Sequence, residues 1–254
     1  MTDHPTTLPP SHPDAEPSRT ALAAADTPTA DSSALEPQPD SFRRVAAIAG
    51  ITAVTVGLVT MPLMGSAPGL GASAEDISAY FADNGGLHRL TVVISALLAI
   101  PIVLFFAGVH RAVAAGPGRS AAGWATVFLY GAIMMSATAG LREALYALGV
   151  RYGTADPDPG VLALVSDGSN IAGATMGAWL AVTVGAVGIA AVRAQRTPKW
   201  YAGLCGLIVL IAVVSVIDTI STSTGGAFAG AAFMGFIIWT LTSAVVMLRR
   251  PLLP

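Results

Sequence analysis

The chain has few charged side chains and a single cysteine. Only 11% of its 254 residues are Asp, Glu, Lys or Arg, while 54% are hydrophobic; soluble domains carry about 25% charged residues. The lone Cys205 excludes an internal disulfide and a cysteine-based metal cluster. Low charge combined with apolar runs of about 20 residues places the chain among integral membrane proteins.

Motifs of enzymes and cofactor-binding proteins are also missing from the sequence. It contains no H-E-x-x-H, no G-x-S-x-G and no P-loop. His88 and His110 flank one apolar run and would stand about 33 Å apart on a helix, so they cannot share a metal ion. We interpret each as an interfacial residue. The sequence therefore predicts no enzyme activity, no cofactor, no resident metal and no nucleic-acid partner.

Six apolar segments are long enough to cross a hydrocarbon core of about 30 Å at about 1.5 Å per residue. In lipid each must be helical, because no water is available to the backbone. We therefore predict an all-α, polytopic membrane helix bundle with a transmembrane domain over 42–250. The predicted spans are about 44–65, 88–112, 120–148, 161–193, 200–220 and 227–248.

Residues 1–41 differ from the rest of the chain. They hold eight prolines, seven acidic residues and one basic residue, Arg19. Such a stretch buries too little apolar surface to offset the loss of chain entropy. We predict a disordered, acidic, Pro-rich cytoplasmic tail, and leave open whether it recruits a partner or is only solvated.

Basic residues are distributed unevenly between the two predicted sides. Nine lie on one side, namely Arg43, Arg44, Arg111, Arg119, Arg193, Arg196, Lys199, Arg249 and Arg250. Three, Arg89, Arg142 and Arg151, lie on the other. Positively charged connections stay in the cytoplasm, which predicts cytoplasmic termini. Twelve arginines against one lysine are typical of a GC-rich bacterial genome, so we predict a bacterial inner membrane.

The first outer connection contains its own helix signal. "SAED", from Ser73 to Asp76, resembles a capping box, and Ile77, Tyr80 and Phe81 follow at helical spacing. We predict a short amphipathic helix at about 74–83 on the outer interface. It would serve either as a lid over a cavity or as a cover for helix ends.

Small residues recur every four positions in several predicted spans, which favours close helix packing in lipid. The predicted packing glycines are Gly140, Gly173, Gly177, Gly185, Gly226 and Gly230. Packing inside the bundle is the preferred interpretation, and homodimerisation is the alternative.

Polar residues gather at the predicted outer ends of the spans. They are Arg89, Arg142, Glu143, Asp167, Asn170 and Asp218. Neighbouring helix residues point about 100° apart, so we expect Arg142 and Glu143 not to pair with each other. Two interpretations stay open: a network that fixes helix ends, or an outward-facing vestibule for a small polar or cationic ligand.

Three stretches together carry a resemblance. "ASAEDISAYFADNGGLHRL", "FFAGVHRAV" and "RTPKWYAGLCG" resemble a broad group of uncharacterised bacterial multi-pass membrane proteins, over about residues 43–250. The resemblance implies the six-helix fold and carries over no activity and no site residues.

The preferred functional hypothesis is a non-enzymatic membrane protein with a structural, accessory or sensory role. Proton pumps and ion-coupled carriers place ionisable groups deep in the membrane, and the predicted spans hold none near their centres. The alternative is a small-solute transporter or channel that uses the outer polar residues. The expected partners are the lipid bilayer and either a second copy of the chain or another membrane protein.

The predicted orientation is testable by cysteine labelling of intact cells. A membrane-impermeant thiol reagent should modify the Ala155→Cys variant and leave the Arg196→Cys variant unmodified. The reverse pattern would show that the spans had been miscounted.

Overall fold

The structure is a computed structural model that describes residues 41–249 except 66, 84, 117–118, 153–157, 195–196 and 222–226. Within these ranges the chain forms helices and no strand. The elements are α1 Ser41–Thr60, the 3-10 turn η1 Met61–Met64, α2 Ala74–Asp83, α3 Gly85–Ala114, α4 Arg119–Tyr152, α5 Pro159–Ala194, α6 Lys199–Ser221 and α7 Ala227–Arg249. The predicted tail lies outside the described residues, except for Ser41 in α1.

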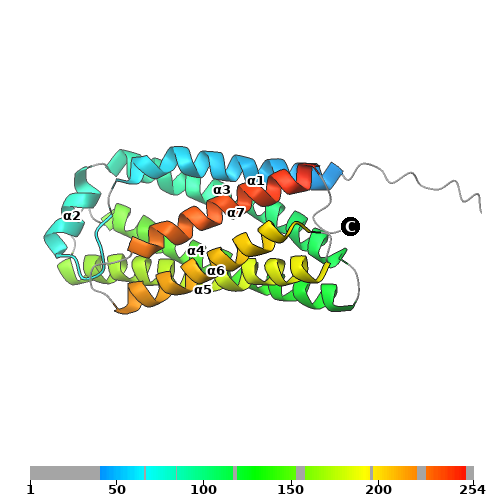
Figure 1. The fold of residues 1–254 in the computed structure, drawn as a ribbon. Coiled ribbons are helices and arrows are strands. Elements are labelled where there is room, and N and C mark those ends of the chain that lie inside the picture. Colours follow the sequence, from blue (N-terminus) through cyan, green and yellow to red (C-terminus); the bar gives the residue numbers. More distant parts are fainter. Residues whose placement is uncertain are drawn as a thin grey trace, which may run out of the picture. The chain divides into compact units, whose positions relative to one another are not determined.

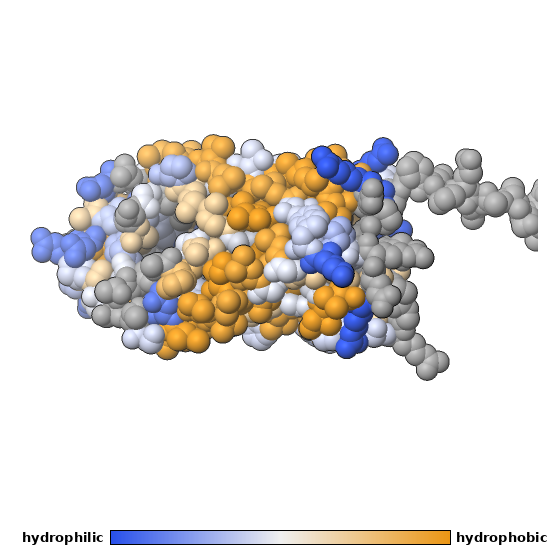
Figure 2. All heavy atoms as spheres, in the orientation of Figure 1, coloured by the Kyte–Doolittle hydropathy of each residue, from blue (hydrophilic) through white to orange (hydrophobic). Residues whose placement is uncertain are grey.

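Six of these helices are long and apolar enough to cross a membrane, and the exception is the short α2. The prediction of an all-α bundle with six spans is confirmed, with helix ends that differ from the predicted ones by a few residues. Figure 2 shows, on one face of the bundle, a hydrophobic belt across the middle with hydrophilic residues towards both ends. The chain is therefore a multi-pass membrane protein.

The six long helices pack in chain order into a closed ring. Each contacts the next, from α1 through α3, α4, α5 and α6 to α7, and α7 returns to α1. Successive long helices are antiparallel, so α3, α5 and α7 all begin at one end of the bundle. The short α2 crosses that end (Figure 1), which we call the α2 end. The other, where Ser41 and Arg249 lie, is the terminal end.

Local sequence explains where α5 begins. The carboxylate of Asp158 accepts a hydrogen bond from the amide of Gly160 at 2.7 Å, and Pro159 occupies the first helical position. A proline there forfeits no helical hydrogen bond, because the first amides of a helix have no partner within it. This N-cap positions the start of α5 at the α2 end.

The interior of the ring is filled by apolar side chains. Phe105 of α3, Phe128 of α4 and Trp239 of α7 are almost fully buried in one continuous core. Buried hydroxyls within this core serve the fold: Thr183 donates to the carbonyl of Trp179 at 2.7 Å. Likewise the hydroxyls of Tyr201 and Ser243 bond to each other at 2.7 Å, which links α6 to α7.

The predicted packing glycines of α5 lie against neighbouring helices. A methyl group added at Gly177 would stand 3.2 Å from a methyl carbon of Val216 in α6, and one at Gly185 would stand 3.5 Å from Val209. Gly173 faces the side chain of Arg142 in α4, at 3.4 Å. These glycines allow α5 to approach both neighbours closely.

The predicted glycines of the third and sixth spans are placed differently. Added methyl groups at Gly140 and Gly230 would meet nothing within 4 Å, so packing inside the bundle is corrected for these two positions. Gly226 lies outside the described residues. The close approach of α4 to α5 occurs instead at Gly131, where an added methyl would stand 2.7 Å from the Thr183 hydroxyl and 3.0 Å from its amide nitrogen.

The close contact between α4 and α5 at Gly131 can be tested by adding one methyl group there. Gly131→Ala should lower the free energy of unfolding in detergent by ~1–3 kcal/mol, the range for overpacking. The clash there is with backbone, which cannot rotate away. Gly123→Ala is the matched control, because Gly123 lies on the same helix and faces open space. Equal stability of the two variants would contradict the tight crossing.

Candidate functional site: the α2 end of the bundle

The short helix α2 begins at a side-chain cap. The Ser73 hydroxyl accepts a hydrogen bond from the amide of Asp76 at 3.1 Å and donates one to the Asp76 carboxylate at 2.7 Å. A cap of this kind satisfies one of the unpaired amides at a helix start. The helix therefore occupies the range in which the capping motif predicts it.

The apolar face of α2 packs onto the ends of other helices. Ile77 and Phe81 are buried in a second small core with Tyr146 and Leu162. The ring of Phe81 lies directly on Gly149 of α4, where there is no room for a side chain. Of the two predicted roles for this helix, the contacts are those of a cover for the ends of α4 and α5.

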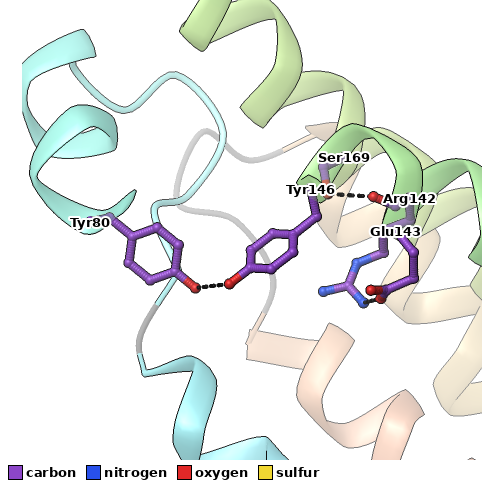
Figure 3. Close-up of polar contacts among 5 residues, drawn as sticks. All are labelled: Tyr80, Arg142, Glu143, Tyr146 and Ser169. Carbon is purple, nitrogen blue, oxygen red and sulfur yellow. Dashed lines mark hydrogen bonds and ion pairs between the residues drawn. The ribbon is translucent and has the colours of Figure 1, made fainter. Parts of the chain in front are cut away.

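A buried histidine connects α2 to the two helices beneath it. His88, at the start of α3, is only 1% exposed. Its Nε2 lies 3.0 Å from the carbonyl oxygen of Tyr80 in α2, and its Nδ1 is in hydrogen-bonding contact with the Tyr146 hydroxyl of α4. The hydroxyls of Tyr80 and Tyr146 lie 3.2 Å apart (Figure 3). We call these three residues the cap network.

The direction of the hydrogen bonds follows from the chemistry of each group. A carbonyl oxygen only accepts, so we assign the proton of a neutral His88 ring to Nε2. Nδ1 then accepts from Tyr146, and the Tyr146 oxygen accepts from Tyr80. A phenol is protonated at neutral pH, so Tyr80 has a proton to donate, and burial raises the pKa of this phenol further. Each donor in the chain thus meets an acceptor.

The cap network corrects the interpretation of His88 as an interfacial residue. Its ring is buried because α3 begins two residues after the last residue of α2, so that the histidine lies close to Tyr80 and Phe81 of α2. The sequence signal for half of this site is the eight-residue separation of Tyr80 and His88. Tyr146 is 58 residues away from His88, and no local pattern predicts such a contact.

Arg142 and Glu143 form the contact that sequence reasoning excluded. Their side chains meet at 3.4 Å and are 38% and 26% exposed. The two Cα–Cβ bonds diverge, but the long arginine side chain turns back to its neighbour, as Figure 3 shows. A strong charge-assisted hydrogen bond measures about 2.7–2.9 Å, so this pairing is weak. The helix α4 continues for about 14 Å beyond Glu143, to Tyr152. The pair therefore lies inside α4 and not at its last turn.

Asp167 and Asn170 hold the connection that leads into α2. The Asp167 carboxylate accepts from the amide of Gly71 at 3.0 Å, and the Asn170 side chain donates to the carbonyl of Pro68 at 3.2 Å. Gly71 has φ +72°, a conformation that glycine adopts without strain. These two predicted site residues therefore tie a loop to α5.

The remaining predicted site residues lie elsewhere at the α2 end. Arg89 is exposed on α3 and lines a groove together with Arg151 of α4. Asp218 is partly buried three residues before the end of α6. The six predicted site residues thus have different partners and settings in the structure, and their action as one site stays a prediction.

The fold and the cap together define a class, a bundle of six candidate membrane-spanning helices with a short amphipathic helix packed on three of them at one end. Among the residues that the structure describes, no three His, Cys, Asp or Glu side chains come together as metal ligands. No protein-family model, curated protein or solved structure matches the chain. The resemblance to a group of bacterial membrane proteins stays a prediction.

The cap network is testable by removing one hydroxyl. Tyr146→Phe deletes the donor to His88 Nδ1 and leaves a buried nitrogen unpaired, which costs about 1–3 kcal/mol. Backbone hydrogen–deuterium exchange of peptides covering residues 74–83 should accelerate by about tenfold, within that range. Tyr130→Phe is the control, because Tyr130 lies on the same helix and is 66% exposed. Unchanged exchange in Tyr146→Phe would show that the network does not hold α2.

Proposed function

We propose that the protein is a non-enzymatic membrane protein with an accessory or sensory role, and that α2 is its working part. The observation that carries this proposal is the buried hydrogen-bond link from α2 through Tyr146 and His88 to α3 and α4. A partner or ligand that displaces α2 must break this link. Movement of α2 would therefore reach two membrane-spanning helices directly.

The outward face of α2 is available for such an encounter. Glu75, Asp76, Ala79, Ala82 and Asp83 are all exposed, opposite the buried face that holds Ile77. A helix that is anchored on one side and polar on the other suits contact with a second protein at this surface. We propose a membrane-associated partner or a second copy of this chain.

The interior of the bundle argues against a carrier. In α3 the stretch from Leu90 to Val109 contains no Asp, Glu, Lys, Arg or His. Glu143 of α4 stands beside Ser95 of this stretch. Ion-coupled carriers usually hold such groups near the middle of the membrane. The buried hydroxyls of Thr183, Tyr201 and Ser243 are engaged within the fold.

We further propose that the chain resides in a bacterial inner membrane with both termini in the cytoplasm and α2 outside. The excess of basic residues at the terminal end supports this orientation.

A site-specific crosslink tests the role of α2. A photoreactive amino acid in place of Ala79 should yield one crosslinked product of defined mass in native membranes. The same photoreactive amino acid in place of Leu97, which is 59% exposed on α3, should yield no crosslinked product, because Leu97 belongs to the hydrophobic surface of the bundle. Absence of a product at both Ala79 and Ala82 would contradict the proposal.

A small-solute transporter is the second candidate, favoured by one observation. Glu143 is partly buried beside the Arg142 guanidinium and the Ser95 hydroxyl of α3, a setting in which a carboxylate could bind a cation. Flux into liposomes that is lost in Glu143→Gln but kept in Glu75→Gln would establish transport and overturn the accessory role.

A further inference from the structure

A groove between α3 and α4 at the α2 end has an arginine on each wall. It encloses about 320 Å³ and is lined by Arg89, Val92, Val93, Ala147, Val150 and Arg151. Each helix contributes one arginine and two apolar residues at i, i+3 and i+4 spacing, which is one helix face. Because α3 and α4 are antiparallel, both arginines stand at the α2 end. Val92 and Val93 of α3 and Ala147 of α4 lie about one turn deeper, and Val150 lies beside Arg151.

The charges at this groove call for an anion. Among the described residues, neither guanidinium forms an ion pair or a hydrogen bond. The guanidinium carbon of Arg151 lies 5.9 Å from the centre of the Tyr152 ring. Two guanidinium groups across one groove repel each other, and a phosphate bound between them would turn that repulsion into charge-assisted hydrogen bonds. Arginine suits phosphate because its planar donors match the phosphate oxygens.

The apolar surface below the groove has the length of a lipid tail. Val93, Leu97, Ile100 and Leu104 lie on one face of α3 and are 56%, 59%, 63% and 37% exposed. From Val93 to Leu104 the helix rises about 16 Å, close to half of a hydrocarbon core of about 30 Å. An acyl chain of one leaflet would therefore cover this stripe when its headgroup lies at the arginines.

We propose that this groove is a binding site for an anionic phospholipid of the phosphatidylglycerol type. Arg89 and Arg151 bind the phosphate, and one acyl chain lies along the exposed stripe of α3. A zwitterionic phosphatidylcholine would bring a quaternary ammonium group towards the two arginines, so the site discriminates against it. This lipid site does not depend on the role proposed for α2.

Native mass spectrometry of the delipidated full-length chain in a neutral detergent tests the proposal. Titrated phosphatidylglycerol should bind the unmodified chain at least tenfold more tightly than phosphatidylcholine. R89Q/R151Q should lose at least tenfold in affinity for phosphatidylglycerol, and each single variant should lose about threefold. R89K/R151K, which keeps both charges without the planar donors, should fall between the unmodified chain and R89Q/R151Q.

R44Q/R249Q is the matched control, because it removes two arginines from the terminal end and should bind phosphatidylglycerol as the unmodified chain does. Equal binding by R89Q/R151Q, or equal binding of the two lipids, would overturn the proposal. Competition by millimolar inorganic phosphate as effective as that by phosphatidylglycerol would also overturn it, since the site would then take a free anion without needing a lipid tail.

Discussion

A backbone inside hydrocarbon has to satisfy its own hydrogen bonds, and the rest of this structure depends on that constraint. It makes each apolar segment a helix, and it leaves close contact between helices as the main source of cohesion. The ring from α1 to α7 closes in chain order, and Gly131 lets the backbones of α4 and α5 meet. Most charged side chains lie near the two ends of the helices, while Arg142 and Glu143 lie about 14 Å before the end of α4.

The α2 end contains buried polar groups of its own. His88 and Thr91 are each 1% exposed there, and both have hydrogen-bond partners in the structure. Burying an unpaired polar group is costly, so the cap network holds together as a unit. It joins α2, α3 and α4 through three side chains. The same end carries the two-arginine groove, so the surfaces proposed for a protein partner and for a lipid both lie at this end of the bundle.

The number and approximate limits of the spans could be predicted, because hydropathy and helical rise are properties of consecutive residues. The capping motif at Ser73 and the proline start at Pro159 are local in the same way. The spacing of small residues predicted the helix contacts of some glycines and not of others. Gly177 does face α6, but Gly140 and Gly230 face open space, since a four-residue repeat specifies a face of a helix without specifying its neighbour. Divergent Cα–Cβ bonds likewise could not exclude the contact between Arg142 and Glu143.

The sequence by itself determined that this is an α-helical membrane protein with six apolar segments long enough to span the bilayer. These features follow from the solvent preference of each segment and do not depend on how the segments meet. Only the tertiary structure decided that Tyr146 reaches His88, that Phe81 seats on Gly149, and that Arg89 stands across a groove from Arg151. Such pairings join residues far apart in the chain, and they depend on how each helix is rotated about its axis, which packing sets and local pattern does not.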